Sequence, residues 1–71
     1  MSRAYETVIL DVDVLADSEL AIQVTDGDVT VWIPKYLLKA DDDCLTAETA
    51  LPGVSGRICI SQSVAEDKEL V

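Results

Sequence analysis

Carboxylates are the residues of this chain most able to do chemistry. They occur as pairs at Asp11/Asp13 and Asp26/Asp28 and as a run at Asp41–Asp43. Paired carboxylates can serve acid–base catalysis when a cleft drives their pKa values apart, but a chain of 71 residues has little volume for a cleft. The ligand spacing of an EF-hand, with a glutamate at its twelfth position, is absent from these segments. We therefore interpret the carboxylates as solvated charge and expect no bound metal.

The other residue types used in catalysis are scarce. The chain has no histidine, which is the commonest general base and metal ligand, so no serine has a histidine to activate it. Cys44 and Cys59 have no further Cys or His with which to complete a zinc site. We expect both cysteines to be reduced rather than joined in a disulfide. We predict that the protein is not an enzyme and uses no cofactor.

Composition narrows the class of protein and of partner. Fourteen acidic residues against five basic ones give a net charge of −9. Phosphate binding requires Lys and Arg, so direct nucleic-acid binding is not expected. A hydrophobic content of 49% favours a folded chain over a disordered one. Met1–Tyr5 begins no signal peptide and no apolar stretch is long enough to span a membrane, so we expect one soluble intracellular domain, residues 1–71.

Strands must position most of these side chains. Apolar residues alternate along Thr7–Ala16, which predicts a strand with Asp11 and Asp13 sharing one face. Leu20–Ile33 predicts a β-hairpin closed by a two-residue Asp26-Gly27 turn, with the glycine at positive φ. The register that keeps the apolar residues on one face has these facing pairs: Leu20/Ile33, Ile22/Val31 and Val24/Val29.

The middle of the chain is less regular. Pro34 ends the clean ladder because it lacks an amide donor. Lys35–Ala40 fits either a short strand or a helical turn. A loop then runs from Asp41 to about Gly56, and Asp43 could cap a short helix over Cys44–Ala50. The conformation of residues 37–56 is left open.

The last third predicts a strand and a helix. Arg57–Ser61 forms the strand, and Gln62–Val71 forms a short helix in which Ser63 and Glu66 have capping-box spacing. The expected fold class is mainly β (α+β): a small antiparallel sheet of four to five strands, curled into a barrel or half-barrel, with one short C-terminal helix. Only Arg57 would block pairing along the final strand. We expect a monomer whose edge the C-terminal helix covers, or a symmetric dimer, with the monomer favoured.

Trp32 is the one aromatic residue that falls on the polar side of the hairpin. In the register above it joins Gln23, Thr25 and Thr30. One interpretation is that barrel closure, Tyr36 or the C-terminal helix covers the ring, which then forms a second small core. The other is an exposed aromatic anchor for a partner, since Trp is enriched at binding hot spots.

A larger pattern surrounds Trp32. The segment AIQVTDGDVTVWIPKYLL, an acidic connection, GRICIS and a terminal helix ending at Leu70 resemble a group of small phage-encoded proteins with a strand motif W-[IL]-P-K. The motif here is Trp32-Ile33-Pro34-Lys35, followed by Tyr36 where the group often has serine, and the resemblance covers Ala21–Leu70. It supplies no catalytic residues. It implies a phage or prophage product acting in the cytoplasm of a bacterial host cell.

Two classes of function follow. In the first, the protein is a nucleic-acid mimic, an inhibitor whose carboxylates occupy the basic surface of a host defence protein, as an anti-CRISPR or anti-restriction protein would. In the second, it is a phage accessory or structural module that binds a host or phage protein through a strand edge or through its tryptophan. No membrane partner is expected. The candidate partner-binding residues are Asp11, Asp13, Asp26, Asp28, Asp41, Asp42, Asp43 and Trp32.

Overall fold

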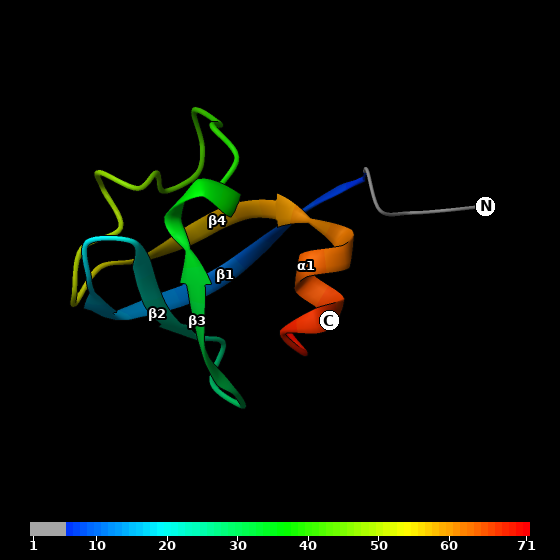
Figure 1. The fold of residues 1–71 in the computed structure, drawn as a ribbon, viewed down its shortest axis with the longest axis horizontal. Coiled ribbons are helices and arrows are strands. Elements are labelled where there is room, and N and C mark those ends of the chain that lie inside the picture. The colour runs from blue at the N-terminus through cyan, green and yellow to red at the C-terminus, as the bar shows by residue number, and fades with distance from the viewer. Residues whose placement is uncertain (1–5) are drawn as a thin grey trace.

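A computed structural model describes residues 6–71, which form a four-stranded antiparallel sheet followed by a short helix (Figure 1). The strands are β1 (Thr7–Asp17), β2 (Ala21–Thr25), β3 (Thr30–Pro34) and β4 (Ser55–Ser61), in the spatial order β3-β2-β1-β4. A 3₁₀ helix, η1 (Lys35–Leu37), follows β3, and the helix α1 (Gln62–Asp67) follows β4. Met1–Tyr5 lie outside the described residues. Within residues 6–71, the helices are too short to cross a membrane.

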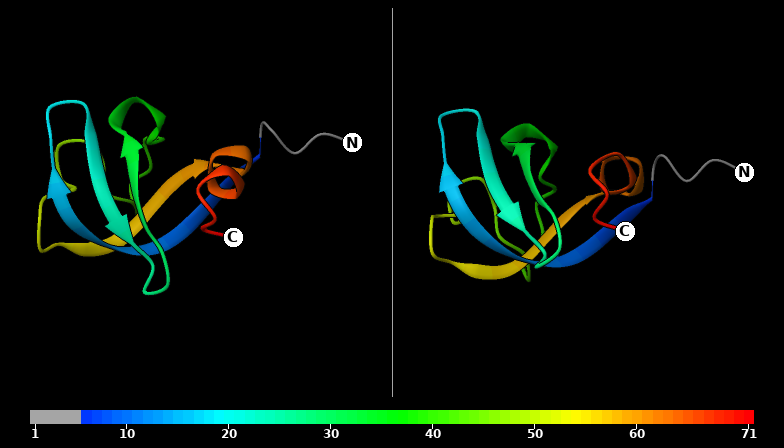
Figure 2. Two further views of the ribbon diagram at one scale, coloured as in Figure 1. Left: turned by 60° about the horizontal axis from the view of Figure 1, so that its bottom comes forward. Right: turned by 90° about the horizontal axis from the view of Figure 1, so that it is seen from below.

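The sheet stays open. β1 and β4 run side by side with strong curvature (Figure 2), but β3 and β4 are separate edges and do not pair. The predicted antiparallel sheet of four strands with one short C-terminal helix is confirmed. Of the predicted barrel and half-barrel, the closed barrel is wrong, because the sheet is not closed. Four strands are too few to close into a barrel with side chains inside, because the diameter of a barrel grows with the number of its strands.

One face of the sheet carries the core. Alternate residues of every strand point to this inner face, where α1 and the segment after β3 cover them. Burying each of these side chains contributes about 1.5–3 kcal/mol. The largest fully buried side chains all come from strands: Val14, Ile22, Val24, Ile33, Ile58 and Ile60.

The β2–β3 hairpin is present, but its predicted register is wrong. The observed partners include Ile22↔Ile33 and Val24↔Val31, which is a shift of two residues from the predicted pairing. Leu20 lies outside the ladder and is 76% exposed. A shift of two residues leaves every side chain on its original face because the side-chain period of a strand is two. The apolar pattern therefore fits both registers equally well.

Hydrogen bonds within the hairpin loop decide between the two registers. The loop contains the four residues Asp26–Val29. Asp26 Oδ1 accepts hydrogen bonds from the backbone N–H of Asp28 at 2.8 Å and of Val29 at 3.0 Å. Thr25 Oγ1 accepts from the Gly27 N–H at 3.1 Å and donates to the Val29 carbonyl at 2.7 Å. These side-chain bonds pair with the backbone N–H and C=O groups of a four-residue loop. They therefore favour the observed register over the one that a two-residue turn would give.

Gly27 has the positive φ that the sequence predicted, at +103°. A Cβ atom built there would have no atom within 4 Å. A side chain at this position would therefore lower stability only because its backbone conformation is strained, and not through steric clashes. We expect Gly27→Val to lower the free energy of unfolding by about 1–2 kcal/mol, measured by urea denaturation. Asp28→Val is the matched control, because it places the same side chain in the same exposed loop at negative φ. Equal losses in the two variants would contradict the argument.

The segment after β3 resolves two open alternatives. Of the strand and the helical turn, the turn is correct, because η1 forms at Lys35–Leu37. Pro34 is the last residue of β3. A proline is tolerated there because β3 is an edge strand. The possible helix over Cys44–Ala50 is absent, and this segment contains one turn, at residues 47–49. β4 begins at Ser55, two residues earlier than predicted.

The cap of α1 also differs from the prediction. Ser61 is the N-cap, and its Oγ accepts a hydrogen bond from the Val64 N–H at 3.3 Å. Ser63, the predicted cap, lies inside the helix. The helix ends at Asp67 instead of reaching Val71.

The outer edge of β4 is covered by residues 38–45, hereafter the covering segment. Lys39 N–H donates to the Cys59 carbonyl at 2.8 Å, and Leu45 N–H donates to the Arg57 carbonyl at 2.6 Å. The Leu45 side chain packs over Gly56, where an added Cβ would lie only 3.1 Å from Leu45 Cγ. The prediction that the C-terminal helix covers this edge is therefore wrong.

Candidate functional site

Three of the predicted carboxylates meet in a hollow on the outer face of the sheet, hereafter the acidic hollow. Strand alternation places Asp11 and Asp13 on this face of β1, and Asp13 is paired with Thr25 of β2 and with Ser55 of β4. Asp26 reaches the same place from the end of β2. The hollow is lined by Asp11, Val12, Asp13, Thr25, Asp26, Ser55 and Gly56.

Hydrogen bonds fix two of these carboxylates. Ser55 Oγ donates to Asp13 Oδ1 at 2.5 Å. The backbone N–H groups of Val29 and then Asp28 hold the pKa of Asp26 below its ordinary value, because both stabilise the charged carboxylate. No Lys or Arg is among the residues that line the hollow. The arrangement is an anionic surface held on strands, suited to meeting Lys and Arg side chains of a partner.

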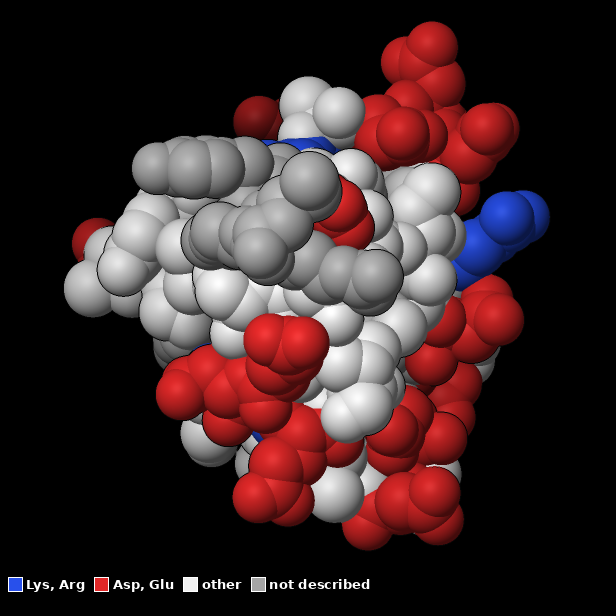
Figure 3. Space-filling model, turned by 90° about the vertical axis from the view of Figure 1, so that its right-hand side faces the viewer, with Lys and Arg blue, Asp and Glu red and all other residues white. Residues whose placement is uncertain are grey.

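The remaining predicted carboxylates lie elsewhere. Asp28 is in the hairpin loop but does not line the hollow. Asp41–Asp43 belong to the covering segment, where Asp41 Oδ1 accepts the Asp43 N–H at 2.9 Å. The structure therefore brings Asp11, Asp13 and Asp26 together and leaves the run of three apart from them. Figure 3 shows the same dispersion, with acidic side chains in several clusters around one side of the molecule.

Few of the negative charges are ion-paired within residues 6–71. All fourteen carboxylates belong to exposed residues. Within residues 6–71, the one salt bridge joins Lys35 Nζ to Asp17 Oδ1 at 2.7 Å. The same residues contain no group of three or more His, Cys, Asp or Glu side chains placed to hold a metal ion.

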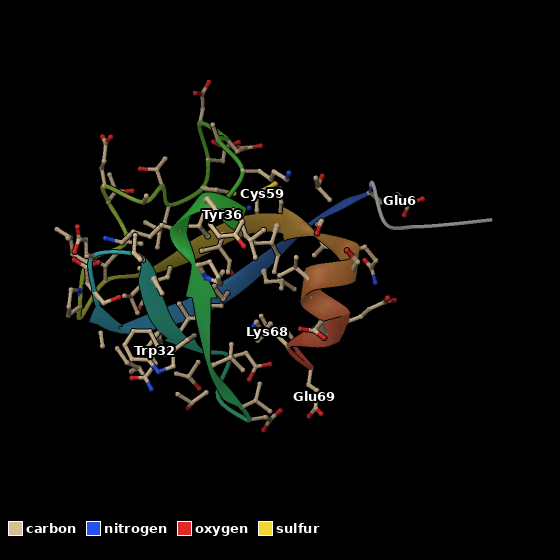
Figure 4. The ribbon with its side chains drawn as sticks, in the orientation of Figure 1. Glu6, Trp32, Tyr36, Cys59, Lys68 and Glu69 are labelled. Carbon is tan, nitrogen blue, oxygen red and sulfur yellow. The ribbon has the colours of Figure 1, made fainter. Side chains whose placement is uncertain are left out.

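Trp32 lies on the outer face of β3 and is 45% exposed. Tyr36 does not cover it, being 83% exposed itself. Of the two interpretations of Trp32, a covered ring in a second small core and an exposed ring, the structure shows the exposed ring. Figure 4 shows the ring on the side of β3 away from α1.

A second surface feature lies along β3 and is hereafter called the edge groove. Val29–Trp32 form one wall, and Asp67–Glu69, at the end of α1, form the other. Asp67–Glu69 are not among the binding residues that the sequence predicted. No local pattern could have found them, because they come near β3 only through the packing of α1 on β1 and β4.

Cys44 and Cys59 are not joined in a disulfide. Cys59 is buried, and Cys44 is half-buried beside the covering segment's aspartates. Desolvation raises the pKa of the Cys44 thiol, and the Asp41 carboxylate raises it further. This thiol is therefore protonated at neutral pH and is a weak nucleophile.

Comparison of the chain with protein-family models, with curated proteins and with solved structures found no match.

Proposed function

We propose that this protein is a non-enzymatic inhibitor that presents its carboxylates to the basic, nucleic-acid-binding surface of another protein and blocks it. The observation that carries the proposal is the uncompensated charge: every carboxylate is on an exposed residue, and one salt bridge is formed within residues 6–71. A field of this sign attracts a basic groove and speeds association with it.

Rigidity of the carboxylates supports binding rather than mere solubility. Asp13 and Asp26 are held by hydrogen bonds to Ser55 and to the hairpin loop. Asp41 is held in the same way by the Asp43 N–H. Side chains that are already ordered lose less conformational entropy when a partner binds, so more of the interaction energy appears as affinity.

The identity of the target comes from the resemblance of the Trp32-Ile33-Pro34-Lys35 motif to small phage proteins. For a phage product in the bacterial cytoplasm, the partner would be a host defence protein that handles nucleic acid, such as a CRISPR effector or a restriction enzyme. The inhibitor would compete with nucleic acid for the same basic surface.

The test is capture from bacterial lysate on the immobilised protein, followed by mass spectrometry. We expect a nucleic-acid-binding protein that duplex DNA displaces and that added salt releases, because exposed charges are screened over about 8–10 Å at physiological salt. With that partner purified, replacing Asp41, Asp42 and Asp43 by Asn should lower the association rate constant by about tenfold.

A charge-matched variant distinguishes the effect of losing these particular aspartates from the effect of lowering the net charge. Changing Glu6, Glu19 and Glu48 to Gln removes the same charge from exposed positions outside both the hollow and the covering segment, and it should change the rate much less. A partner that DNA does not displace and whose binding ignores salt would refute the proposal. The half-exposed Trp32 would then favour the second candidate, a phage accessory module that binds protein, and Trp32→Ala would speed its dissociation.

A further inference from the structure

β3 is the open edge of the sheet. Among the strands of residues 6–71, it pairs with β2 alone. The ladder between them continues at both ends, since Asp26 N–H donates to the Val29 carbonyl at 3.3 Å and Lys35 N–H donates to the Leu20 carbonyl at 2.8 Å. Hydrogen-bonded pairs alternate along an antiparallel ladder. Val31 and Ile33 therefore bond to β2, while Thr30 and Trp32 turn their backbone N–H and C=O groups outward.

The two edges of the sheet differ in this respect. The covering segment caps the carbonyls of Arg57 and Cys59 on β4. Nothing comparable reaches Thr30 or Trp32, which receive no backbone hydrogen bond from another segment of residues 6–71. Unpaired donors and acceptors on an exposed strand form a template for an additional strand.

The edge groove gives this template a second wall. Asp67, Lys68 and Glu69 face β3 across it, and Figure 4 places Lys68 between β3 and α1. Val29 and Val31 on the β3 side are half-buried apolar residues that pack against the core. A chain lying here would meet backbone hydrogen-bonding groups, apolar side chains and a mainly acidic wall.

We propose that the edge groove binds an extended, basic segment of a partner protein, which pairs with β3 as a fifth strand. Backbone bonds to Thr30 and Trp32 would supply affinity, and alternate side chains of the segment would contact the two faces of the sheet. Pro34, which has no N–H, ends the pairing. The inference goes beyond the proposed function, because it uses backbone groups of β3 and can hold when the mimicry of nucleic acid fails.

Charge selects the occupant. Asp67 and Glu69 outnumber Lys68 in the groove, and Asp28 adds a carboxylate in the adjoining loop. A second copy of this chain would bring the same acidic residues together and would set one charge of −9 against another. That repulsion disfavours pairing of two β3 strands and favours a segment rich in Lys or Arg.

The probe is a synthetic hexapeptide of alternating Lys and Val, added to the full chain and followed by amide NMR. We expect hydrogen exchange of the Thr30 and Trp32 amides to slow by about tenfold or more at saturation. The same peptide with its alternate amides N-methylated has identical charge but lacks those donors, and it should bind at least about fivefold more weakly. A peptide of alternating Glu and Val should not bind.

A pair of variants tests the acidic wall. Asp67→Asn with Glu69→Asn should weaken binding of the Lys–Val peptide by about fivefold, and Asn suits the positive φ of 61° at Glu69. Asp42→Asn with Glu48→Gln removes equal charge elsewhere and should have little effect.

Equal binding of the plain and N-methylated peptides, or protection at β4 instead of β3, would overturn the inference while leaving the proposed function intact. Protection of Thr30 and Trp32 that grows with protein concentration and needs no peptide would also overturn it, by making a second copy the occupant.

Discussion

Ile58→Ala is expected to lower the free energy of unfolding by about 2–5 kcal/mol. Ile58 is fully buried on the inner face of β4, opposite Leu10 of β1. Removing its side chain beyond Cβ loses apolar burial and leaves a cavity that the strands cannot close. Domains as small as this one often have little more than about 5 kcal/mol of stability in total. The variant should therefore be partly unfolded in dilute buffer.

Urea denaturation followed by circular dichroism measures the loss. Ile9→Ala is the matched control, because it makes the same chemical change on the outer face of β1, where Ile9 is 49% exposed. Its cost should stay within about 0.5 kcal/mol. If both variants lost the same stability, the inner face of the sheet would not be the core of this protein.

The sequence predicted the inner face of the sheet because that prediction needs only local information. Alternation along β1 separates Val12 and Val14 from Asp11 and Asp13 whatever the strand pairs with. The same reasoning identified the hairpin and the positive φ of Gly27. Those features depend on near neighbours in the chain, and local pattern determines them.

The register predicted for the β2–β3 hairpin was wrong because the alternation of apolar residues cannot determine it. A period of two cannot distinguish two pairings that differ by two residues. The distinction lies in Asp26 and Thr25, whose side chains bond to the hairpin loop. Similarly, the capping-box spacing predicted Ser63 as the cap of α1, whereas β4 ends at Ser61 and the side chain of Ser61 caps the helix.

The candidate site was predictable only in part. Asp11 and Asp13 share a face by alternation, but their meeting with Asp26 depends on the pairing of β1 with β2. The position of Asp41–Asp43 depends on hydrogen bonds between the covering segment and β4, which link residues with no common sequence pattern. The edge groove likewise exists only because α1 packs on β1 and β4, which leaves the end of the helix across from β3.

Leu45→Asp is expected to uncover the second edge of the sheet. Leu45 joins the covering segment to β4 twice, through its N–H to the Arg57 carbonyl and through its side chain over Gly56. A carboxylate in this half-buried apolar place should cost about 2–4 kcal/mol of stability and release the segment. The freed carbonyls of Arg57 and Cys59 would then form an open edge. The charged side chain of this edge, Arg57, is basic. Two copies of the protein would therefore repel each other less at β4 than at β3.

Self-association is the result that this argument predicts for Leu45→Asp. Light scattering at micromolar concentration should show a mass at least twice that of one chain, rising with added salt as the net charge is screened. Leu51→Asp is the matched control, since Leu51 lies in the same loop and is 48% exposed, and this variant should scatter as the unmodified protein does. A Leu45→Asp protein that stays folded and monomeric at high salt would show that the covering segment does not protect β4. Edge protection would then have to come from the shortness and twist of the strand, because β4 is only seven residues long and short, twisted edges pair poorly.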